Sequence, residues 1–248
     1  GKLLDPRLLE LSYRCADTVA LVREGMEVDY CHRFYDYSFK AKLVPNCLRT
    51  EIYALAKMPL EVAYSIDCSN ENRKHVEQLL DVKNDYRFIN IARFADEKGQ
   101  LRLIDAFEIF HKQHPNSQLF IIGGYGPKLS DIEDRVSKSP FKEKIAVILG
   151  SNNPFPLVKH CNAFVLSSFY EGLPLTIVEA IHLGLKIVST DIPGPSEFLA
   201  QGYGLLVDNS TVGIAKGMSL AMEGKIPYKP YNIDKHNAVA VDAFVSLL

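Results

Sequence analysis

The chain has 248 residues, 47% of them apolar, and its 28 Lys and Arg side chains nearly balance its 30 Asp and Glu side chains. This length suffices for one full domain with part of a second. The balanced charge offers no basic excess for a phosphate backbone, so we expect no nucleic-acid partner. No apolar run reaches the roughly 18 residues of a membrane span and the first residues lack a signal-peptide pattern, so a cytoplasmic protein is predicted.

Neither the cysteines nor the histidines show the spacing of a metal site. The five cysteines are an odd number without a CxxC pair, which argues against both a disulfide framework and a zinc site. The seven histidines show no HxxxH or HExxH spacing. We therefore expect no cofactor and no metal held by the protein, and we expect the thiols to be reduced and mostly packing residues. The cysteines are Cys15, Cys31, Cys47, Cys68 and Cys161.

Residues 1–45 differ in pattern from the rest of the chain. They contain an amphipathic stretch at Leu4–Tyr13, a short strand at Thr18–Val22, a tyrosine-rich segment at Tyr30–Tyr37 and a strand at Lys42–Val44. This is too little for an independent domain of the kind that follows.

From Arg87 onward, short apolar runs alternate with longer helical patterns. This rhythm predicts an α/β fold, a Rossmann-like parallel sheet with helices on both faces. The runs are too apolar to alternate, as expected of strands buried on both faces. The predicted strands are Phe88–Ile91, Leu119–Ile122, Ile145–Leu149, Phe164–Leu166, Ile187–Ser189 and a short Leu205–Val207.

Helices are expected between and around these strands. Pro115 and Gly184 supply two of the stop signals, and Asn209 or Ser210 supplies one cap. The predicted helices are Glu51–Lys57, Asn72–Leu80, Lys98–Lys112, Lys128–Ser137, Pro156–Cys161, Pro174–Leu183, one after Ser210, and Asp234–Leu247.

The segment 167–180 carries the strongest functional signal. It follows a buried strand and runs into a helix, at the sheet edge where ligands of parallel sheets gather. Pro174 suits the first helical position, but Leu173 has no side-chain oxygen to cap the free N–H groups of the first turn, which includes Thr176 and Ile177. With Gly172 beside it, this helix start is predicted to bind phosphate.

Two carboxylates accompany that helix start. Glu171 lies in the loop before it and Glu179 more than one turn inside it, so the two would contact opposite ends of an extended ligand. Alone, Glu171 could be a solvated loop residue and Glu179 a helix-surface acid. Their spacing and context together favour a binding site.

Two cations follow another strand at the same edge. Arg93 can hold phosphate oxygens with two hydrogen bonds and Lys98 can supply a point charge, so together they could offset a departing diphosphate. Two exposed charges on a polar loop are the alternative.

A glycine-rich turn follows the strand that ends at Ile122. A dinucleotide fingerprint requires GxGxxG, and Leu129 occupies its third position, which argues against an NAD site. Gly124 and Gly126 are instead expected to let the backbone approach a different ligand. A purely structural turn is the alternative for Tyr125.

Taken in order, these residues resemble the donor-lobe signature of family 4 retaining glycosyltransferases (glycosyltransferase group 1), which have the two-lobed GT-B fold. The resemblance covers roughly residues 85 to 225, and Ala92 departs from it where the family often has glycine. It rests on Arg93, Glu97-Lys98-Gly99, Gly124-Tyr125-Gly126-Pro127, Glu171, Gly172-Leu173-Pro174, Glu179, Ser189-Thr190-Asp191, Gly194, Glu197 and 202–207.

The resemblance implies a role for each part of the site. Arg93 and Lys98 would hold the donor diphosphate, the backbone from Gly172 to Thr176 would meet its phosphates, and Glu171 would bond hydroxyls of the transferred sugar. Glu179 would bind the nucleotide ribose. The segment 149–154, which includes Gly150, would lie along the base.

The resemblance also implies that the chain divides into three parts. Residues 1–45 would be the tail of an incomplete acceptor lobe, 46–225 the nucleotide-sugar donor domain, and 226–248 a C-terminal helix packing near the lobe junction. Pro45-Asn46 matches the family's turn between lobes. The full-length protein would add the missing N-terminal lobe and a saccharide or polyol-phosphate acceptor.

A finer similarity concerns enzymes that build or decorate bacterial cell-surface polymers such as teichoic acid or capsule. It rests on Asn153–Pro156, Cys161 and Tyr170-Glu171-Gly172. It implies cell-envelope biosynthesis, with the full-length protein associated peripherally with the inner face of the membrane.

The implied reaction is transfer of a hexose from a nucleotide diphosphate sugar, expected to be UDP-linked, to a hydroxyl with the anomeric configuration kept. Poor turnover by this chain alone is expected, since catalysis needs both lobes and their closure. Two alternatives are a non-catalytic nucleotide-sugar-binding module and a UDP-sugar epimerase of GT-B shape.

Overall fold

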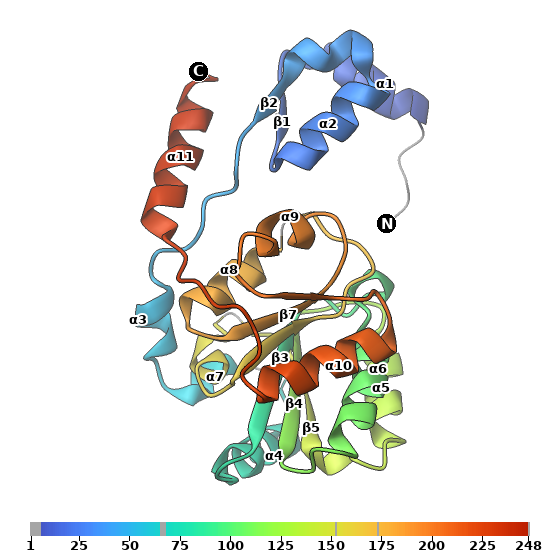
Figure 1. Ribbon diagram of the computed structural model, residues 1–248, viewed down its shortest axis with the longest axis vertical. Coiled ribbons are helices and arrows are strands. Elements are labelled where there is room, and N and C mark those ends of the chain that lie inside the picture. Colours follow the sequence, from blue (N-terminus) through green and yellow to red (C-terminus); the bar gives the residue numbers. More distant parts are fainter. Residues whose placement is uncertain (1–5, 65–67, 152, 173, 248) are drawn as a thin grey trace. The chain divides into compact units, whose positions relative to one another are not determined.

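The computed structural model describes residues 6–64, 68–151, 153–172 and 174–247 (Figure 1). The chain forms two compact units, one made of 1–48 with 232–248 and the other of 49–231. The chain therefore passes between the units twice, after Leu48 and after Tyr231.

The larger unit is built on a six-stranded sheet in which every neighbouring pair of strands is parallel. The strand order is β5-β4-β3-β6-β7-β8. This confirms the predicted Rossmann-like fold class, and each predicted strand is present with bounds within two residues. The strands are β3 (Tyr86–Ile91), β4 (Ser117–Gly123), β5 (Ile145–Leu149), β6 (Ala163–Leu166), β7 (Lys186–Thr190) and β8 (Leu205–Val207).

Helices precede, connect and follow these strands. They are α3 (Ile52–Ala56), α4 (Asn70–Asp81), α5 (Gln100–His111), α6 (Leu129–Ser137), α7 (Phe155–Val158), α8 (Leu175–His182), α9 (Pro195–Leu199) and α10 (Thr211–Met222). Short 3-10 turns are η2 (Leu60–Ala63), η3 (Asp96–Lys98) and η4 (Lys142–Lys144).

Two predicted helix starts need correction. Lys98 belongs to η3 rather than to α5, because Gly99 has a left-handed backbone (φ 63°) that ends the turn before α5 begins. Pro174 is the extended residue before α8 rather than its first helical residue. The predicted cap is confirmed at Ser210, whose hydroxyl accepts a hydrogen bond from the Gly213 N–H at 3.0 Å.

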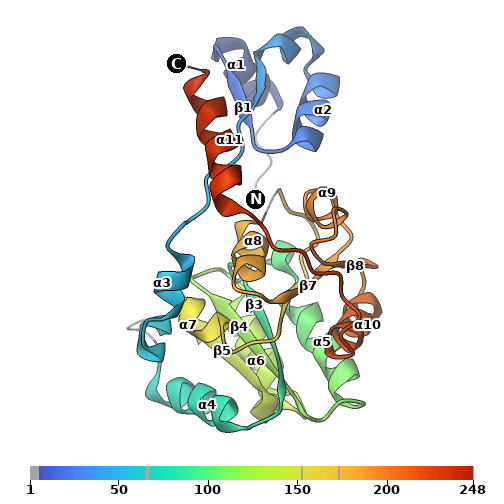
Figure 2. The ribbon, with the colours of Figure 1, turned by 60° about the vertical axis from the view of Figure 1, so that its left-hand side comes forward.

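Side chains of the strands alternate between two buried faces. Phe88, Leu119 and Val165 pack in one cluster with residues of α5, α6 and α10. Ile89 and Phe120 are equally buried but lie outside that cluster, on the other face of the sheet. Figure 2 shows α4, α7 and α8 on one side of the sheet and α5 and α10 on the other.

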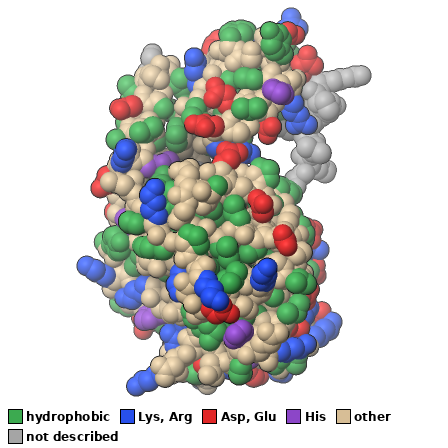
Figure 3. All heavy atoms as spheres, in the orientation of Figure 1, with side chains coloured by type: hydrophobic (Ala, Val, Ile, Leu, Met, Phe, Trp, Pro, Cys, Tyr) green, Lys and Arg blue, Asp and Glu red, His purple; other side chains and the backbone are tan. Residues whose placement is uncertain are grey.

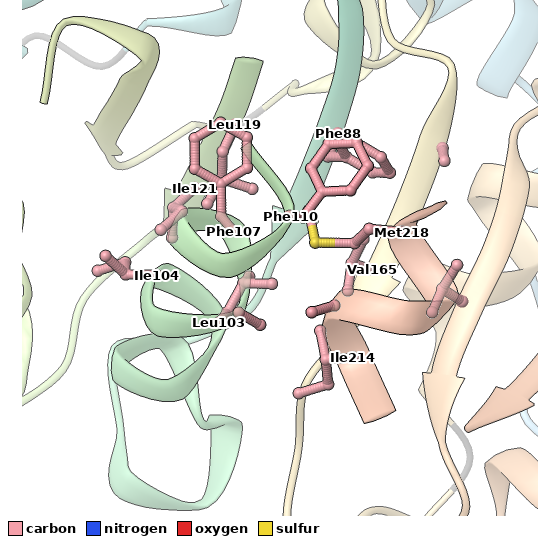
Figure 4. Packing of buried hydrophobic residues seen from close by; sticks show 14 of the residues in the cluster. Phe88, Leu103, Ile104, Phe107, Phe110, Leu119, Ile121, Val165, Ile214 and Met218 are labelled. Carbon is pink, nitrogen blue, oxygen red and sulfur yellow. The ribbon is translucent and has the colours of Figure 1, made fainter. Parts of the chain in front are cut away.

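A large part of the core lies between α5, α10 and the sheet, where Phe107, Phe110 and Met218 are almost fully buried (Figure 4). A Cβ on Gly217 of α10 would lie 2.5 Å from a methyl group of Val188. Glycine at this position therefore lets α10 lie directly on β7.

The smaller unit contains two strands that pair in parallel, β1 (Val19–Leu21) and β2 (Ala41–Leu43). Its helices are α1 (Pro6–Cys15), α2 (Glu24–Arg33), the 3-10 helix η1 (Tyr35–Lys40) and α11 (Ile233–Val245). The tyrosine-rich segment is thus helical, which sequence reasoning did not anticipate.

Aromatic side chains form the core of the smaller unit. Tyr13 packs edge-on against Tyr30 and Phe34, with ring centroids 4.9 and 4.6 Å apart. The Lys40 ammonium donates hydrogen bonds to the carbonyls of Tyr13, Arg14 and Ala16, at the C-terminal end of α1. The cation compensates the carbonyl groups that a helix end leaves without partners.

The C-terminal helix belongs to the smaller unit, and one amide side chain ties it to the chain there. Asn237 of α11 accepts a hydrogen bond from the Leu48 N–H at 2.8 Å and donates one to the Leu48 carbonyl at 2.9 Å.

The five cysteines are free thiols, and they differ in burial. Cys68 and Cys161 are buried, and burial raises the pKa of the Cys161 thiol. Cys15 and Cys47 are exposed and Cys31 is half-buried. Cys31 packs against the core of the smaller unit, so three of the five cysteines are packing residues, as expected for most of them.

Charged side chains of both signs are mixed over the face shown in Figure 3, in keeping with the near-neutral net charge. Among the described residues, no helix combines the length and apolarity that a membrane span requires.

Phe107 supplies a test of the core between α5 and the sheet. Phe107→Ala should lower the free energy of unfolding by about 3–5 kcal/mol, because it removes a fully buried ring. Ile109→Ala is the matched control, since Ile109 is exposed on the same helix and its loss should change stability by about 0.5 kcal/mol or less. Equal effects in urea denaturation would show that this packing is wrongly assigned.

Candidate functional site

The strand order reverses between β3 and β6. From β3 the chain proceeds to β4 and β5 on one side, whereas β6, β7 and β8 lie on the other side. In an open parallel sheet, the loops at the carboxyl ends of the two strands beside such a reversal form the usual ligand site. Here these are the β3 loop (residues 92–99) and the β6 loop (residues 167–172).

The β3 loop is anchored by Phe94, which is fully buried. The Phe94 N–H donates to the Tyr125 carbonyl at 2.9 Å, and the Phe94 carbonyl accepts from the Lys128 N–H at 3.0 Å. These bonds hold the loop against the glycine-rich turn after β4.

The two predicted glycines of that turn differ in their surroundings. Gly126 has φ 149°, and a Cβ there would overlap the Phe94 backbone. Protein packing therefore accounts for Gly126. Gly124 is exposed and a Cβ there would meet no protein atom within 4 Å, so approach by a ligand stays a prediction for this residue.

Arg93 lies on the outer side of the β3 loop with its side chain 56% exposed. Its guanidinium donates to the Glu97 carboxylate at 2.9 Å, and its backbone carbonyl accepts from the Gln100 amide at 2.7 Å. The Arg93 guanidinium is thus paired with Glu97, while more than half of the side chain stays exposed to solvent.

Lys98 and Glu171 join the two loops. The Lys98 ammonium donates to the Glu171 carboxylate at 2.7 Å, and the two side chains are only 16% and 10% exposed. The Ser168 hydroxyl donates to the same carboxylate oxygen at 2.7 Å. Two residues predicted to serve different parts of a donor are therefore direct partners in this structure.

Backbone contacts reinforce the junction between the loops. The Phe169 N–H donates to the Glu97 carbonyl at 2.8 Å, and the Ser167 hydroxyl donates to the Lys98 carbonyl at 2.9 Å. The β6 loop is thereby fixed to the β3 loop on both sides of Ser168.

Arg102 of α5 is a functional candidate that sequence reasoning missed. Its guanidinium donates hydrogen bonds to the carbonyls of Ser167 and Ser168 and lies over the Phe169 ring, 3.7 Å from the centroid. Burial lowers the pKa of Arg102. The available signal was a cation four residues after Lys98, directly flanked by the apolar residues Leu101 and Leu103.

The β6 loop also touches the turn after β7. Gly194 has φ 84°, and a Cβ there would overlap the Gly172 carbonyl. Gly172 itself is exposed, and a Cβ on it would meet no protein atom within 4 Å. The protein therefore leaves the outer side of the Gly172 backbone open.

Helix α8 begins at Leu175 without a side-chain cap. The Ile177 N–H is bonded to the Pro174 carbonyl at 3.1 Å, so the expectation that this amide is free is wrong. Thr176 is half-buried in the first turn. Leu173, which was predicted to contact the donor, lies outside the described residues.

Glu179 lies one turn further along α8 and is half-buried. Burial raises the pKa of its carboxyl, and the positive charge of Arg49 partly offsets this effect. Burial therefore disfavours the carboxylate form of Glu179.

The segment after β5 is anchored at both ends. Gly150 has a left-handed backbone (φ 60°), and its N–H donates to the Gly123 carbonyl at 2.7 Å. The Asn153 amide donates to the Leu55 carbonyl at 3.0 Å. Across the described ranges, no group of three or more His, Cys, Asp or Glu side chains is arranged to hold a metal ion.

Comparison with known proteins places this site in a family. The model of the family described as glycosyl transferases group 1 matches residues 71–235, well over half of the chain. The chain belongs to this family. The match spans the two loops, the glycine-rich turn and α8.

Two relatives show the same relationship. An uncharacterized glycosyltransferase of Methanocaldococcus jannaschii is 32% identical over 190 residues, covering 75% of this chain and 43% of the relative. The capsular polysaccharide biosynthesis glycosyltransferase CapH of Staphylococcus aureus is 32% identical over 169 residues, covering 65% of this chain and 45% of the relative. The chain thus spans less than half the length of either relative.

A solved structure supports the fold. HepE of Anabaena, determined in complex with UDP and glucose, superposes with a TM-score of 0.65 at 15% sequence identity, covering 97% of this chain and 66% of that one. The predicted GT-B fold class is confirmed.

The two glycines of the β4 turn should respond differently to a methyl group. Gly126→Ala should lower the free energy of unfolding by about 1–3 kcal/mol, because its Cβ would overlap the Phe94 backbone. Gly124→Ala should change it by about 0.5 kcal/mol or less, because its Cβ enters open space. Thermal and urea denaturation of both variants check this, and a neutral Gly126→Ala would contradict the packing described.

A double-mutant cycle should detect the Lys98–Glu171 pair. Lys98→Met and Glu171→Gln should each lower the free energy of unfolding by about 1.5–3 kcal/mol, because each leaves a poorly exposed charge without its partner. The double variant should lose clearly less than the sum of the two. Additive losses in urea denaturation would show that the two charges do not interact.

Proposed function

We propose that this chain is the donor-binding part of a retaining glycosyltransferase that takes a sugar from a nucleotide diphosphate sugar. The observation that carries the proposal is the junction of the two switch-point loops. There the Lys98–Glu171 pair lies between buried strand ends, close in sequence to the open Gly172 backbone and to a helix start without a side-chain cap.

Each charge at the junction has a part in the proposed chemistry. Arg93 and Lys98 bind the donor diphosphate and, with the first amides of α8, stabilise the negative charge that develops as it departs. Glu171 bonds hydroxyls of the transferred sugar. No metal held by the protein is invoked.

Lys98 and Glu171 then act as a coupled pair. In the structure the Lys98 ammonium and the Ser168 hydroxyl bind one Glu171 oxygen, which fixes the direction of the carboxylate. This contact would fix the position of a diphosphate bound to Lys98 relative to a sugar hydroxyl bound to Glu171. Positioning of this kind is what a transferase needs in order to align the reacting bond.

The remaining parts of the donor are assigned as the family resemblance implies. Glu179, further along α8, binds the ribose, and the segment 149–154, which contains Gly150, lies along the base. UDP is the proposed nucleotide, supported by the UDP bound in HepE. Binding of a ribose hydroxyl to the Glu179 carboxylate would lower its raised pKa.

The acceptor side is proposed to lie outside this donor unit. The smaller unit, with its two parallel strands, is taken as part of an acceptor lobe, in line with a chain that spans less than half of its relatives. The name of CapH supports a role in capsular polysaccharide biosynthesis. A saccharide or polyol-phosphate acceptor is part of the proposal.

Calorimetric titration with UDP, UDP-glucose, UDP-GlcNAc and GDP tests the donor site. We expect saturable binding of uridine nucleotides that weakens about tenfold or more in Arg93→Ala and in Glu179→Ala, because each loses a hydrogen bond to a charged group. Lys138→Ala is the matched control, since Lys138 is an exposed residue that directly follows α6 and pairs locally with Asp134.

The other outcomes are equally informative. No binding of any of the four ligands would contradict the donor-site proposal. Conversion of a UDP-sugar by the chain without an acceptor would instead indicate an epimerase.

A further inference from the structure

Arg102 makes an unusual set of contacts for a residue near the start of a helix. Its Nε donates to the Ser167 carbonyl at 2.8 Å, and its Nη2 donates to the carbonyls of Ser167 at 2.5 Å and Ser168 at 2.7 Å. The guanidinium plane covers the Phe169 ring. One side chain of α5 thus holds three consecutive residues of the β6 loop.

The carbonyl groups of Ser167 and Ser168 need a hydrogen-bond donor such as the Arg102 guanidinium. Ser167 and Ser168 are fully buried and follow the last residue of β6, so no neighbouring strand pairs with them. The Thr190 hydroxyl supplies a second donor to the Ser168 carbonyl at 2.7 Å. A buried carbonyl that loses its donor destabilises the conformation that buries it.

Gly99 permits the close approach of α5 to this loop. A Cβ at Gly99 would overlap the Ser167 carbonyl and would lie 2.8 Å from the Arg102 Nε. The start of α5 and the end of β6 are therefore fitted to each other around the guanidinium.

The contacts lead directly to Glu171. Arg102 fixes the Ser168 carbonyl, and the Ser168 hydroxyl donates to the Glu171 carboxylate. We propose that Arg102 is a positioning residue that fixes the β6 loop so that Glu171 meets the transferred sugar. The inference rests on the donor-site function proposed above and adds to it a residue that contacts no part of the donor.

Arginine suits this role better than lysine. The planar guanidinium of arginine can donate hydrogen bonds to two carbonyls at once while stacking on an aromatic ring. The ammonium group of lysine is a compact point charge without such a plane. A cavity of about 330 Å³ lies beside it, lined by Gly99, Arg102, Asp105, Lys128 and Phe169 among others. Truncation of Arg102 would therefore leave a site that free guanidinium can enter.

The first test separates the sugar from the nucleotide. Calorimetry with Arg102→Ala should show affinity for UDP-glucose or UDP-GlcNAc reduced about tenfold or more, because the loop that presents Glu171 is released. Affinity for UDP should stay within about twofold, because UDP lacks the sugar whose hydroxyls Glu171 is proposed to bond. Arg102→Lys should fall between wild type and Arg102→Ala.

Lys112→Ala is the matched control, since Lys112 is an exposed cation at the other end of α5. It should leave the affinity for both kinds of ligand unchanged.

The second test restores the missing group. Millimolar guanidinium chloride, compared with sodium chloride at equal concentration, should recover UDP-sugar affinity in Arg102→Ala but not in Arg102→Ala combined with Glu171→Gln. Hydrogen exchange of the Phe169 amide, which donates to the Glu97 carbonyl, should speed up in Arg102→Ala and slow again with guanidinium. This second readout needs no ligand.

The outcomes separate the role of Arg102 from the donor-site function. Equal loss of affinity for UDP and UDP-sugars in Arg102→Ala, or no loss for either, would overturn the role of Arg102 while leaving the donor site intact. Unchanged Phe169 exchange would overturn it too. If the wild-type chain bound none of these nucleotides, the donor-site function itself would fail, and the role of Arg102 with it.

Discussion

The contact between Lys98 and Glu171 is the constraint on which the candidate site depends. It brings together two loops that are 73 residues apart in sequence, and it does so where neither side chain is well exposed. Placing both charges there is tolerable only because each is the other's partner. Hydrogen bonds donated by Ser167, Ser168 and Phe169 hold the Lys98–Glu171 ion pair in one geometry.

The parallel sheet makes this contact available. Because β3 and β6 are neighbours and point the same way, their carboxyl ends deliver both loops to one edge. The buried cluster that includes residues of α5 and α10 then fixes where α5 starts along the sheet. This also fixes the positions of Lys98, just before the helix, and of Arg102 in its first turn. Core packing and charge placement are thus two consequences of the same strand order.

The strands could be predicted from the sequence because short, continuously apolar runs such as Ile145–Leu149 are typical of strands buried on both faces. Sequence reasoning also placed Arg93, Lys98, Glu171 and Glu179 after strands or near helix starts, which is local information. It did not foresee that Lys98 binds Glu171, because no spacing along a chain encodes contacts across a sheet edge. Arg102 escaped for a related reason, since a cation on a helix resembles a surface charge until its buried carbonyl partners are known.

The distribution of thiols has a practical consequence. The three cysteines that are not buried, Cys15, Cys47 and the half-buried Cys31, belong to the smaller unit, whereas Cys68 and Cys161 of the larger unit are buried. A thiolate must be reachable and ionised to react. Maleimide dyes or spin labels applied to the folded, unaltered chain would therefore mark the smaller unit and spare the larger one, giving spectroscopy a native reporter confined to the smaller unit.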